Sequence, residues 1–243
     1  MINYDANTHV FYSDIIENPN FVCGFGTRLL GDGRQRSTLI NFCEHNNLSY
    51  ESIIVPDQIH SINIEEVSKN RQLVQVVDTT DGVVTKESHV LLTVVTADCL
   101  PIMFADQKKN IIGISHQGWR GSLKNMATHM IKKMIQLGAT SDSIKIAIGP
   151  GIGACCYKIY GERLYEFLAE YEKWKDMILQ ERSGHTYINL PRLNFLQLRE
   201  FGIKKEQIDF FPFCTKCDKN RFFSYQRDDK KNYGEMVSFI LKT

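Results

Sequence analysis

The sequence predicts an α/β fold with mixed β-sheets and with helices packed on the outside, organised as one domain over residues 1–243. Short apolar runs typical of strands alternate with segments in which apolar residues recur at helical spacing. The chain has 243 residues and a hydrophobic content of 43%, which suffices to bury a substantial core. No linker-like stretch divides the sequence, and it contains neither an internal repeat nor a low-complexity segment.

The N-terminal part of the chain predicts one helix followed by several strands. Apolar residues at helical spacing indicate a helix in RQRSTLINFCEHNN (34–47), which starts near Asp32 or Gly33. His60 is expected in the turn between the first two strands, where its side chain is exposed at a strand end. The predicted strands are SYESIIVP (49–56), HSINIEEV (60–67), DGVVT (81–85) and HVLLTVVT (89–96).

An antiparallel hairpin is expected in the middle of the sequence. The apolar runs TVVTADCLPIMFAD (93–106) and NIIGISHQGWRG (110–121) are joined by the polar turn DQKKN. This turn lies midway between Cys99 and His116. The two side chains should therefore lie close together at the open end of the hairpin.

Helices and strands alternate in the remainder of the chain. A helix over 122–139 would place apolar side chains on one face and end at Gly138. The residues of that face are Leu123, Met126, Met130, Ile131 and Met134. Further helices are expected over 162–179 and 191–202, and strands over 144–148, 186–190, 208–213 and 236–242.

Charge and composition argue against several classes of partner. The 29 Lys and Arg residues balance the 28 Asp and Glu residues, so nothing calls for nucleic acid or an anionic membrane surface. The N-terminus lacks the basic and apolar regions of a signal peptide. The most apolar stretch, VLLTVVTADCLPIMF, is interrupted by Asp98 and is too short to span a membrane. Seven cysteines without the spacing of a secreted scaffold favour a reducing cytoplasm.

His60, Cys99 and His116 form a candidate metal site, because each stands beside a sharp turn in PDQIHS, TVVTADCLPI and GISHQGWRG. Two imidazoles and one thiolate suit zinc, and three protein ligands leave the fourth tetrahedral position for water or substrate. Taken alone, such a cysteine is usually a small buried hydrophobe and such a histidine an ordinary hydrogen-bonded residue. The hairpin that brings Cys99 to His116 favours the metal interpretation.

Five motifs in this chain resemble those of the laccase-domain family, which is also described as purine nucleoside phosphorylase and adenosine deaminase. They are QIH of PDQIHS, TADCLPI, SHQGWRG, GPGIGACCYKI and CTKCDKNRFFSYQRD, and with FGTRLLG the resemblance extends from about Gly24 to the C-terminus. The resemblance implies that His60, Cys99 and His116 bind zinc at an active site for purine nucleosides and phosphate. TDGVVT, with Asp81, matches a further family loop. No counterpart of the family's Asn-Leu-Gly stretch is found between Arg28 and Pro56.

Four further residues are expected to take part in catalysis or substrate binding. Arg120 is predicted to be catalytic and to bind an anion, because its guanidinium offers a fixed fork of donors; a structural salt bridge is the alternative. Arg28 and Gln58 are predicted substrate-binding residues by the resemblance. Asp98 is a predicted catalytic residue that either orients a ligand imidazole, pointing away from Cys99 in a regular strand, or caps the turn.

The other motifs have simpler interpretations. GPGIG lacks the Lys-Ser/Thr of a phosphate loop, so we interpret it as a tight turn near the site. Tyr225 and Arg227 are candidate residues of the pocket wall. Adjacent cysteines diverge in an extended chain, which favours buried thiols over a second metal site for Cys155, Cys156, Cys214 and Cys217.

The preferred function is that of a zinc enzyme for purine nucleosides. The resemblance to the family implies that it would cleave adenosine, inosine, guanosine and methylthioadenosine with phosphate and would deaminate adenosine. One alternative is a hydrolase that edits peptidoglycan precursors, with Cys99 as nucleophile and His116 or His60 as its base. A second is copper-dependent oxidation of polyphenols, for which no axial methionine is evident. A third is a metal-binding accessory domain, and the oligomeric state stays open.

Overall fold

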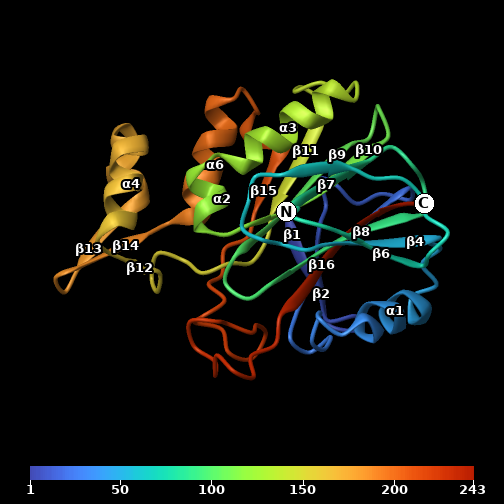
Figure 1. The fold of residues 1–243 in the computed structure, drawn as a ribbon, viewed down its shortest axis with the longest axis horizontal. Helices are drawn as coiled ribbons and strands as arrows, with labels where there is room; N and C mark the ends of the chain where they lie inside the picture. The colour runs from blue at the N-terminus through green and yellow to red at the C-terminus, as the bar shows by residue number, and fades with distance from the viewer.

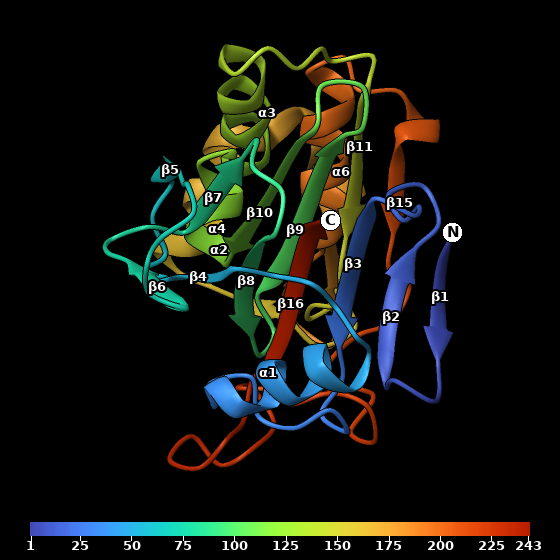
Figure 2. The same cartoon turned by 90° about the vertical axis from the view of Figure 1, so that its right-hand side faces the viewer.

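The computed structural model describes residues 1–243, and two β-sheets stacked face to face form its centre (Figure 1). The larger sheet is antiparallel over its first five strands and parallel over the last two pairs. Strands of this sheet lie side by side in Figure 2. In spatial order its strands are β1 (Ile2–Asp5), β2 (Val10–Ser13), β3 (Phe21–Gly26), β16 (Met236–Lys242), β8 (Val90–Thr96), β4 (Ser52–Pro56) and β6 (Val74–Val77).

The smaller sheet has four antiparallel strands at its centre and a parallel pairing at each edge. Its order is β15 (Ile208–Phe210), β11 (Ile144–Ile148), β9 (Leu100–Asp106), β10 (Ile111–Gln117), β7 (Gly82–Thr85) and β5 (Ile64–Glu66). All residues of β9 and β10 are buried, because the other sheet covers one face and helices cover the other.

Helices complete the layers on both sides of the stacked sheets (Figure 1). Helix α1 (Arg36–His45) covers the larger sheet, where Phe42 lies 5.0 Å from Phe239 of β16 between ring centroids. Helices α2 (Trp119–Leu123), α3 (Met126–Gln136) and α6 (Leu190–Glu200) cover the smaller sheet. Between the sheets lies an apolar layer that includes Phe25, Ile54, Leu92, Met103, Ile112, Ile114 and Ile240, all fully buried.

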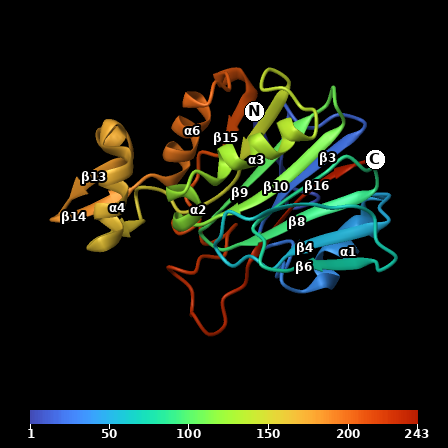
Figure 3. The same cartoon turned by 45° about the horizontal axis from the view of Figure 1, so that its top comes forward.

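A small lobe projects from the helical side (Figures 1 and 3). It consists of a three-stranded sheet with two helices and a 3-10 turn. The Tyr171 hydroxyl joins the lobe to the main body, since it donates to the Leu123 carbonyl at 2.8 Å and accepts from Gln197 at 2.6 Å. The elements are β12 (Lys158–Ile159), β14 (His185–Ile188), β13 (Leu179–Arg182), α4 (Glu162–Tyr171), η1 (Glu172–Trp174) and α5 (Lys175–Ile178); a second 3-10 turn, η2 (Lys205–Gln207), precedes β15.

The predicted α/β class with mixed sheets and outer helices is confirmed, as are the helix in 34–47 and the strand over 236–242. The hairpin is also confirmed: Ile111 pairs with Asp106 and His116 with Pro101. Gly138, at φ 103°, follows the C-cap of α3 as predicted. No helix is long and apolar enough to cross a lipid bilayer.

Several predicted boundaries are wrong. The helix over 122–139 is interrupted at Asn125, whose left-handed φ of 60° separates α2 from α3. The helix over 162–179 ends at Tyr171 and continues as η1 and α5, and the strand over 60–67 shrinks to β5. The run over 93–106 is two strands, because the chain leaves the larger sheet at Thr96 and enters the smaller one at Leu100. Strands β1, β2, β3, β6, β12 and β13 were not predicted.

Candidate metal centre and substrate cavity

Three chain segments bring His60, Cys99 and His116 together. His116 stands near the end of β10, Cys99 immediately precedes β9, and His60 lies in the loop between β4 and β5. Their ligating atoms all lie within 4.8 Å of one another, and Cys99 Sγ is 3.8 Å from His60 Nε2. The predicted proximity of Cys99 and His116 at the open end of the hairpin is therefore confirmed.

Left-handed backbone conformations shape the two loops that carry His60 and Cys99. Gln58, His60 and Asp98 have φ values of 53°, 62° and 85°. Such conformations cost about 1–2 kcal/mol for a residue with a side chain, so neighbouring contacts must hold them. The Gln58 amide provides one: it donates to the Val95 carbonyl and accepts from the Val95 N–H, both at 2.7 Å. These bonds tie the His60 loop to β8.

Asp81 orients two of the three candidate ligands. Its carboxylate accepts the His116 Nδ1–H at 2.7 Å, which leaves His116 Nε2 available as a ligand. The same carboxylate accepts the backbone N–H groups of His60 at 3.0 Å and Ser61 at 2.6 Å. Burial tends to raise the pKa of Asp81, but the bonds from His116 and Ser61 hold it below its ordinary value. The fully buried Asp81 is therefore a charged partner of the ligand set.

The three residues fit a metal ion such as zinc. Zn–N and Zn–S bonds of about 2.1 and 2.3 Å in a tetrahedron separate the nitrogen and sulfur by about 3.6 Å, close to the 3.8 Å between His60 and Cys99. Gly118 leaves room for this arrangement. A Cβ atom there would lie 2.7 Å from His60 Cδ2 and 3.1 Å from Cys99 Sγ.

Cys99 and His116 also influence one another's charge. Burial would raise the pKa of Cys99, but the adjacent His116 and His60 lower it to about 7. Burial would lower the pKa of His116, but the Cys99 charge and the Asp81 hydrogen bond raise it to about 10. A deprotonated thiol near neutral pH is the form that binds a metal or attacks as a nucleophile.

The three ligands open onto a cavity of about 660 Å³. This volume falls within the usual range for small-molecule sites. The wall combines aromatic rings, two guanidinium groups and several acids. Besides the three ligands, the lining residues include Gln58, Asp98, Trp119, Arg120, Ile152, Tyr157, Arg163, Tyr225, Gln226, Tyr233 and Glu235.

Two arginines meet at Trp119 in the cavity wall. The guanidinium carbons of Arg120 and Arg163 lie 4.6 and 4.2 Å from the centre of the indole ring. Arg163 also donates to the Tyr157 hydroxyl at 3.2 Å. Neither guanidinium forms an ion pair with a carboxylate. The two positive charges are thus available to an anionic ligand.

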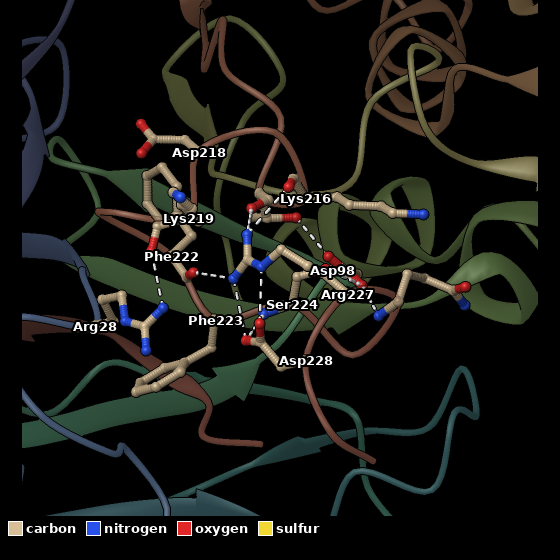
Figure 4. A network of polar contacts seen from close by, with 12 residues as sticks. Arg28, Asp98, Lys216, Asp218, Lys219, Phe222, Phe223, Ser224, Arg227 and Asp228 are labelled. Carbon is tan, nitrogen blue, oxygen red and sulfur yellow. Dashed lines mark hydrogen bonds and ion pairs between the residues drawn. The ribbon is translucent and has the colours of Figure 1, made fainter. Parts of the chain in front are cut away.

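Asp98 does not contact the ligand histidines, because the strand does not stay regular at this residue. Its buried carboxylate accepts from Thr215 Oγ1 at 2.6 Å, Ser224 Oγ at 3.0 Å and the Gln226 N–H at 2.7 Å (Figure 4). The residue therefore anchors the C-terminal segment 211–235 beside Cys99. Asp81, and not Asp98, makes the predicted contact with an imidazole ring.

Arg28 and Arg227 also hold the C-terminal segment and do not line the cavity. Arg28 donates to the Lys219 carbonyl at 2.8 Å and lies over Phe223 (Figure 4). Arg227 donates to several backbone carbonyls, including that of Thr215 at 2.9 Å. Tyr225 lies in the cavity wall as predicted. Sequence reasoning did not single out Tyr157, although it lies inside the GPGIGACCYKI motif. It also missed Arg163, Tyr233 and Glu235, which occur in segments without a recognisable motif.

The prediction of buried thiols for Cys155, Cys156, Cys214 and Cys217 is wrong. Cys155 and Cys217 are exposed and the other two are half-buried. The four sulfur atoms gather within 4.8 Å of one another. The GPGIG turn that precedes Cys155 does border the cavity, through Ile152.

The fold and this site define a laccase-like α/β protein with a His-Cys-His group that could hold a metal ion. Residues 35–243 match the family described as multi-copper polyphenol oxidoreductase laccase, and the chain belongs to this family. The resemblance inferred from the motifs is thereby confirmed.

Named relatives and solved structures agree with this membership. The chain is 30% identical over 202 residues to the purine nucleoside phosphorylase YlmD of Bacillus subtilis (strain 168), covering 80% of this chain and 72% of the relative. It is 25% identical over 226 residues to the adenosine deaminase RL5 of an unknown prokaryotic organism, covering 83% and 86%. The crystal structure of YlmD from Geobacillus stearothermophilus superimposes with a TM-score of 0.83 at 25% identity, covering 99% and 98%.

Proposed function

We propose that the chain is a zinc-dependent purine nucleoside enzyme. It cleaves adenosine, inosine, guanosine and methylthioadenosine with phosphate, and it deaminates adenosine. The observation that carries the proposal is the set of His60, Cys99 and His116 at the wall of a cavity that also presents two unpaired arginines. The names of the relatives, purine nucleoside phosphorylase and adenosine deaminase, support the same substrates.

His60, Cys99 and His116 are the residues that would hold the zinc ion. When bound there, zinc supplies a Lewis acid at the cavity wall. Asp81 keeps the proton of His116 on Nδ1, so that Nε2 faces the metal position. Gln58 and Asp81 hold the His60 loop in place before any substrate arrives.

Arg120 and Arg163 would bind phosphate. Both lie on the cavity wall beside Trp119, and a phosphate between them would accept charge-assisted hydrogen bonds. Phosphorolysis requires this anion, whereas deamination of adenosine does not. The two reactions therefore depend differently on the arginines.

Aromatic residues and one acid offer contacts for the nucleoside. Tyr157, Tyr225 and Tyr233 line the cavity, and Tyr225 is the most exposed of the three, so a purine can stack against its ring. Burial raises the pKa of Glu235, although Arg34 and His116 oppose this shift. A carboxyl group with a raised pKa can hold a proton near neutral pH, so Glu235 is placed to donate a hydrogen bond to a ring nitrogen or sugar hydroxyl.

An arginine substitution tests the proposal most directly. We expect Arg120→Ala to reduce phosphate-dependent cleavage of inosine more than conversion of adenosine to inosine. Loss of a charge-assisted contact costs about 1.5–3 kcal/mol, or about one to two decades in rate. Steady-state rates with both substrates give the comparison. Lys124→Ala, which removes an exposed cation from the end of the same helix, should leave both rates unchanged. Equal loss of both activities in Arg120→Ala would assign this residue to the nucleoside instead.

Metal content tests the zinc assignment. Cys99→Ala should lower the zinc content by about one ion per chain and abolish nucleoside turnover. Copper-loaded protein should turn nucleosides over more slowly, because copper prefers a tetragonal arrangement. The copper form could oxidise a phenolic dye faster than the zinc form turns nucleosides over. That result would favour the oxidase function in the family description over the proposed nucleoside function.

A second candidate function is hydrolysis with Cys99 as nucleophile and His116 as base. The lowered pKa of Cys99, about 7, is the observation that favours it. In this case chelator-treated protein would retain activity against peptidoglycan precursors, and alkylation of Cys99 would abolish it. The zinc proposal predicts no such activity in the absence of metal.

A further inference from the structure

Four cysteines outside the cavity come from two segments that are distant in sequence. Cys155 and Cys156 follow the glycine-rich turn after β11, whereas Cys214 and Cys217 follow β15. The Cys217 sulfur lies 3.5 Å from that of Cys155 and 3.4 Å from that of Cys156. All four sulfur atoms lie within 4.8 Å of one another.

The distances match those of a four-thiolate metal site. Four Zn–S bonds of about 2.3 Å in a tetrahedron place the sulfur atoms about 3.8 Å apart. The two distances from Cys217, 3.5 and 3.4 Å, and the upper limit of 4.8 Å for the whole cluster lie on either side of that value.

A turn allows the adjacent cysteines to share one centre. Residues 154–156 are not extended: the N–H groups of Cys156 and Tyr157 both donate to the Gly153 carbonyl at 2.9 Å. This folded backbone directs the two neighbouring sulfur atoms to the same side. The divergence expected from an extended chain therefore does not apply.

The second pair has the form of a zinc knuckle. Cys214 and Cys217 are separated by two residues in a turn, in which the Asp218 N–H donates to the Cys214 carbonyl at 3.2 Å. The Gly153 N–H donates to Cys214 Sγ at 3.2 Å, a bond that stabilises a thiolate. A Cβ atom on Gly153 would lie 3.3 Å from Cys214 Cβ and 3.4 Å from Cys155 Sγ, so glycine permits this close approach.

We propose that Cys155, Cys156, Cys214 and Cys217 form a structural zinc site, separate from the site at His60, Cys99 and His116. With four thiolates the tetrahedron is complete, and no position is left for water or substrate. Zinc is the ion that this soft, tetrahedral ligand set selects among the common divalent metals.

This zinc site holds together two segments that line the substrate cavity. Ile152 and Tyr157, which flank the first cysteine pair, line the cavity, as do Tyr225 and Gln226 of the segment that follows the second pair. Thr215, next to Cys214, donates to Asp98, the neighbour of Cys99. Cross-linking the two segments therefore fixes one wall of the cavity relative to the catalytic centre.

Zinc stoichiometry of the reduced full-length protein tests the proposal. We expect about two zinc ions per chain in the native protein, and about one in both Cys99→Ala and the double variant Cys155→Ser/Cys217→Ser. Cys155 and Cys217 are exposed, so their replacement leaves the core intact. Cys43→Ala, which removes a cysteine outside both clusters, should retain both ions. X-ray absorption of Cys99→Ala should show a remaining zinc with sulfur ligands only, at about 2.3 Å.

Three results would overturn the second site. The first is a folded, reduced Cys99→Ala protein without zinc. The second is a double variant that keeps as much zinc as the native chain. The third is a disulfide between Cys217 and Cys155 or Cys156 in protein purified with a reductant, detected by mass and thiol titration. Cys99→Ala and the double variant Cys155→Ser/Cys217→Ser each remove a different zinc ion. A result that contradicts one proposed site therefore does not contradict the other.

Discussion

Asp81 is a residue that connects the two proposed ligand histidines to one another and to the rest of the protein. It binds the ring of His116 and the backbone of His60, and its carboxylate is fully buried. Ligand orientation by such a carboxylate typically contributes a factor of 10 to 100 in metal affinity. The geometry of the proposed metal centre therefore depends on a residue outside the proposed ligand set.

Replacing Asp81 by Asn should weaken zinc binding at this centre by about 10- to 100-fold. The amide keeps the shape but removes the charge, and one of its two polar atoms can no longer accept a hydrogen bond. Competition with a chromophoric chelator measures the affinity. Asp78→Asn, which changes an exposed carboxylate close by, should leave the affinity unchanged. An unaltered affinity in Asp81→Asn would show that the metal orients the histidines without help.

Gly118 controls the space between two ligands. In Gly118→Ala the new methyl group would lie 2.7 Å from His60 Cδ2, a distance that forces the ring to move. We expect this variant to lose most of its zinc at this centre and most of its activity, while its far-UV circular dichroism stays native. Gly121→Ala is the control, because its Cβ would meet no atom closer than 3.6 Å. Equal zinc content in Gly118→Ala and Gly121→Ala would show that Gly118 does not provide space needed for zinc binding.

At the scale of elements, the C-terminal segment 211–235 depends on Asp98. Three donors from this segment bind the carboxylate, while the Ile152 N–H donates to the Asp98 carbonyl at 2.9 Å. The turn between β8 and β9 thus holds two cavity walls in place. Tyr225 and Gln226, which line the cavity, belong to the segment held by these bonds.

Thr215→Val should lower the free energy of unfolding by about 1–3 kcal/mol, because it leaves a buried Asp98 oxygen without its hydroxyl donor. Urea denaturation measures the change, and KM for nucleoside should rise as the wall loosens. Thr96→Val is the matched control: this buried hydroxyl has no hydrogen-bond partner, so its loss should be neutral or stabilising. A Thr215 variant as stable as the control would refute the anchoring role.

At the scale of the whole molecule, the layer between the two sheets is an apolar core to which both sheets contribute buried side chains. Met103 of β9 lies fully buried in this layer. Met103→Ala should therefore cost about 2–5 kcal/mol in unfolding free energy, measured by chemical denaturation. Met177→Ala, at a side chain that is 47% exposed, should change stability by less than about 0.5 kcal/mol. A similar loss of unfolding free energy in the two variants would mean that the layer between the sheets repacks into the space left by the Met103 side chain.

Local features of the sequence were sufficient to predict the fold class, the central hairpin and the candidate ligand set. His60, Cys99 and His116 stand out because their residue types and turns are visible in short segments, and pairing across the hairpin follows from its length. Helix breaks were not predictable in the same way. Asn125 interrupts a continuous apolar stripe, and only packing against the sheet decides where the two helices separate.

The tertiary structure alone decided which distant residues meet. Asp81 rather than Asp98 orients His116, Arg163 reaches the cavity from the small lobe, and four cysteines converge from two turns. These contacts join segments separated by dozens of residues, and they depend on how the sheets stack and where the loops cross. Periodicity and spacing report the conformation of a segment and its exposed face. Periodicity and spacing do not indicate which other segment will lie against that face.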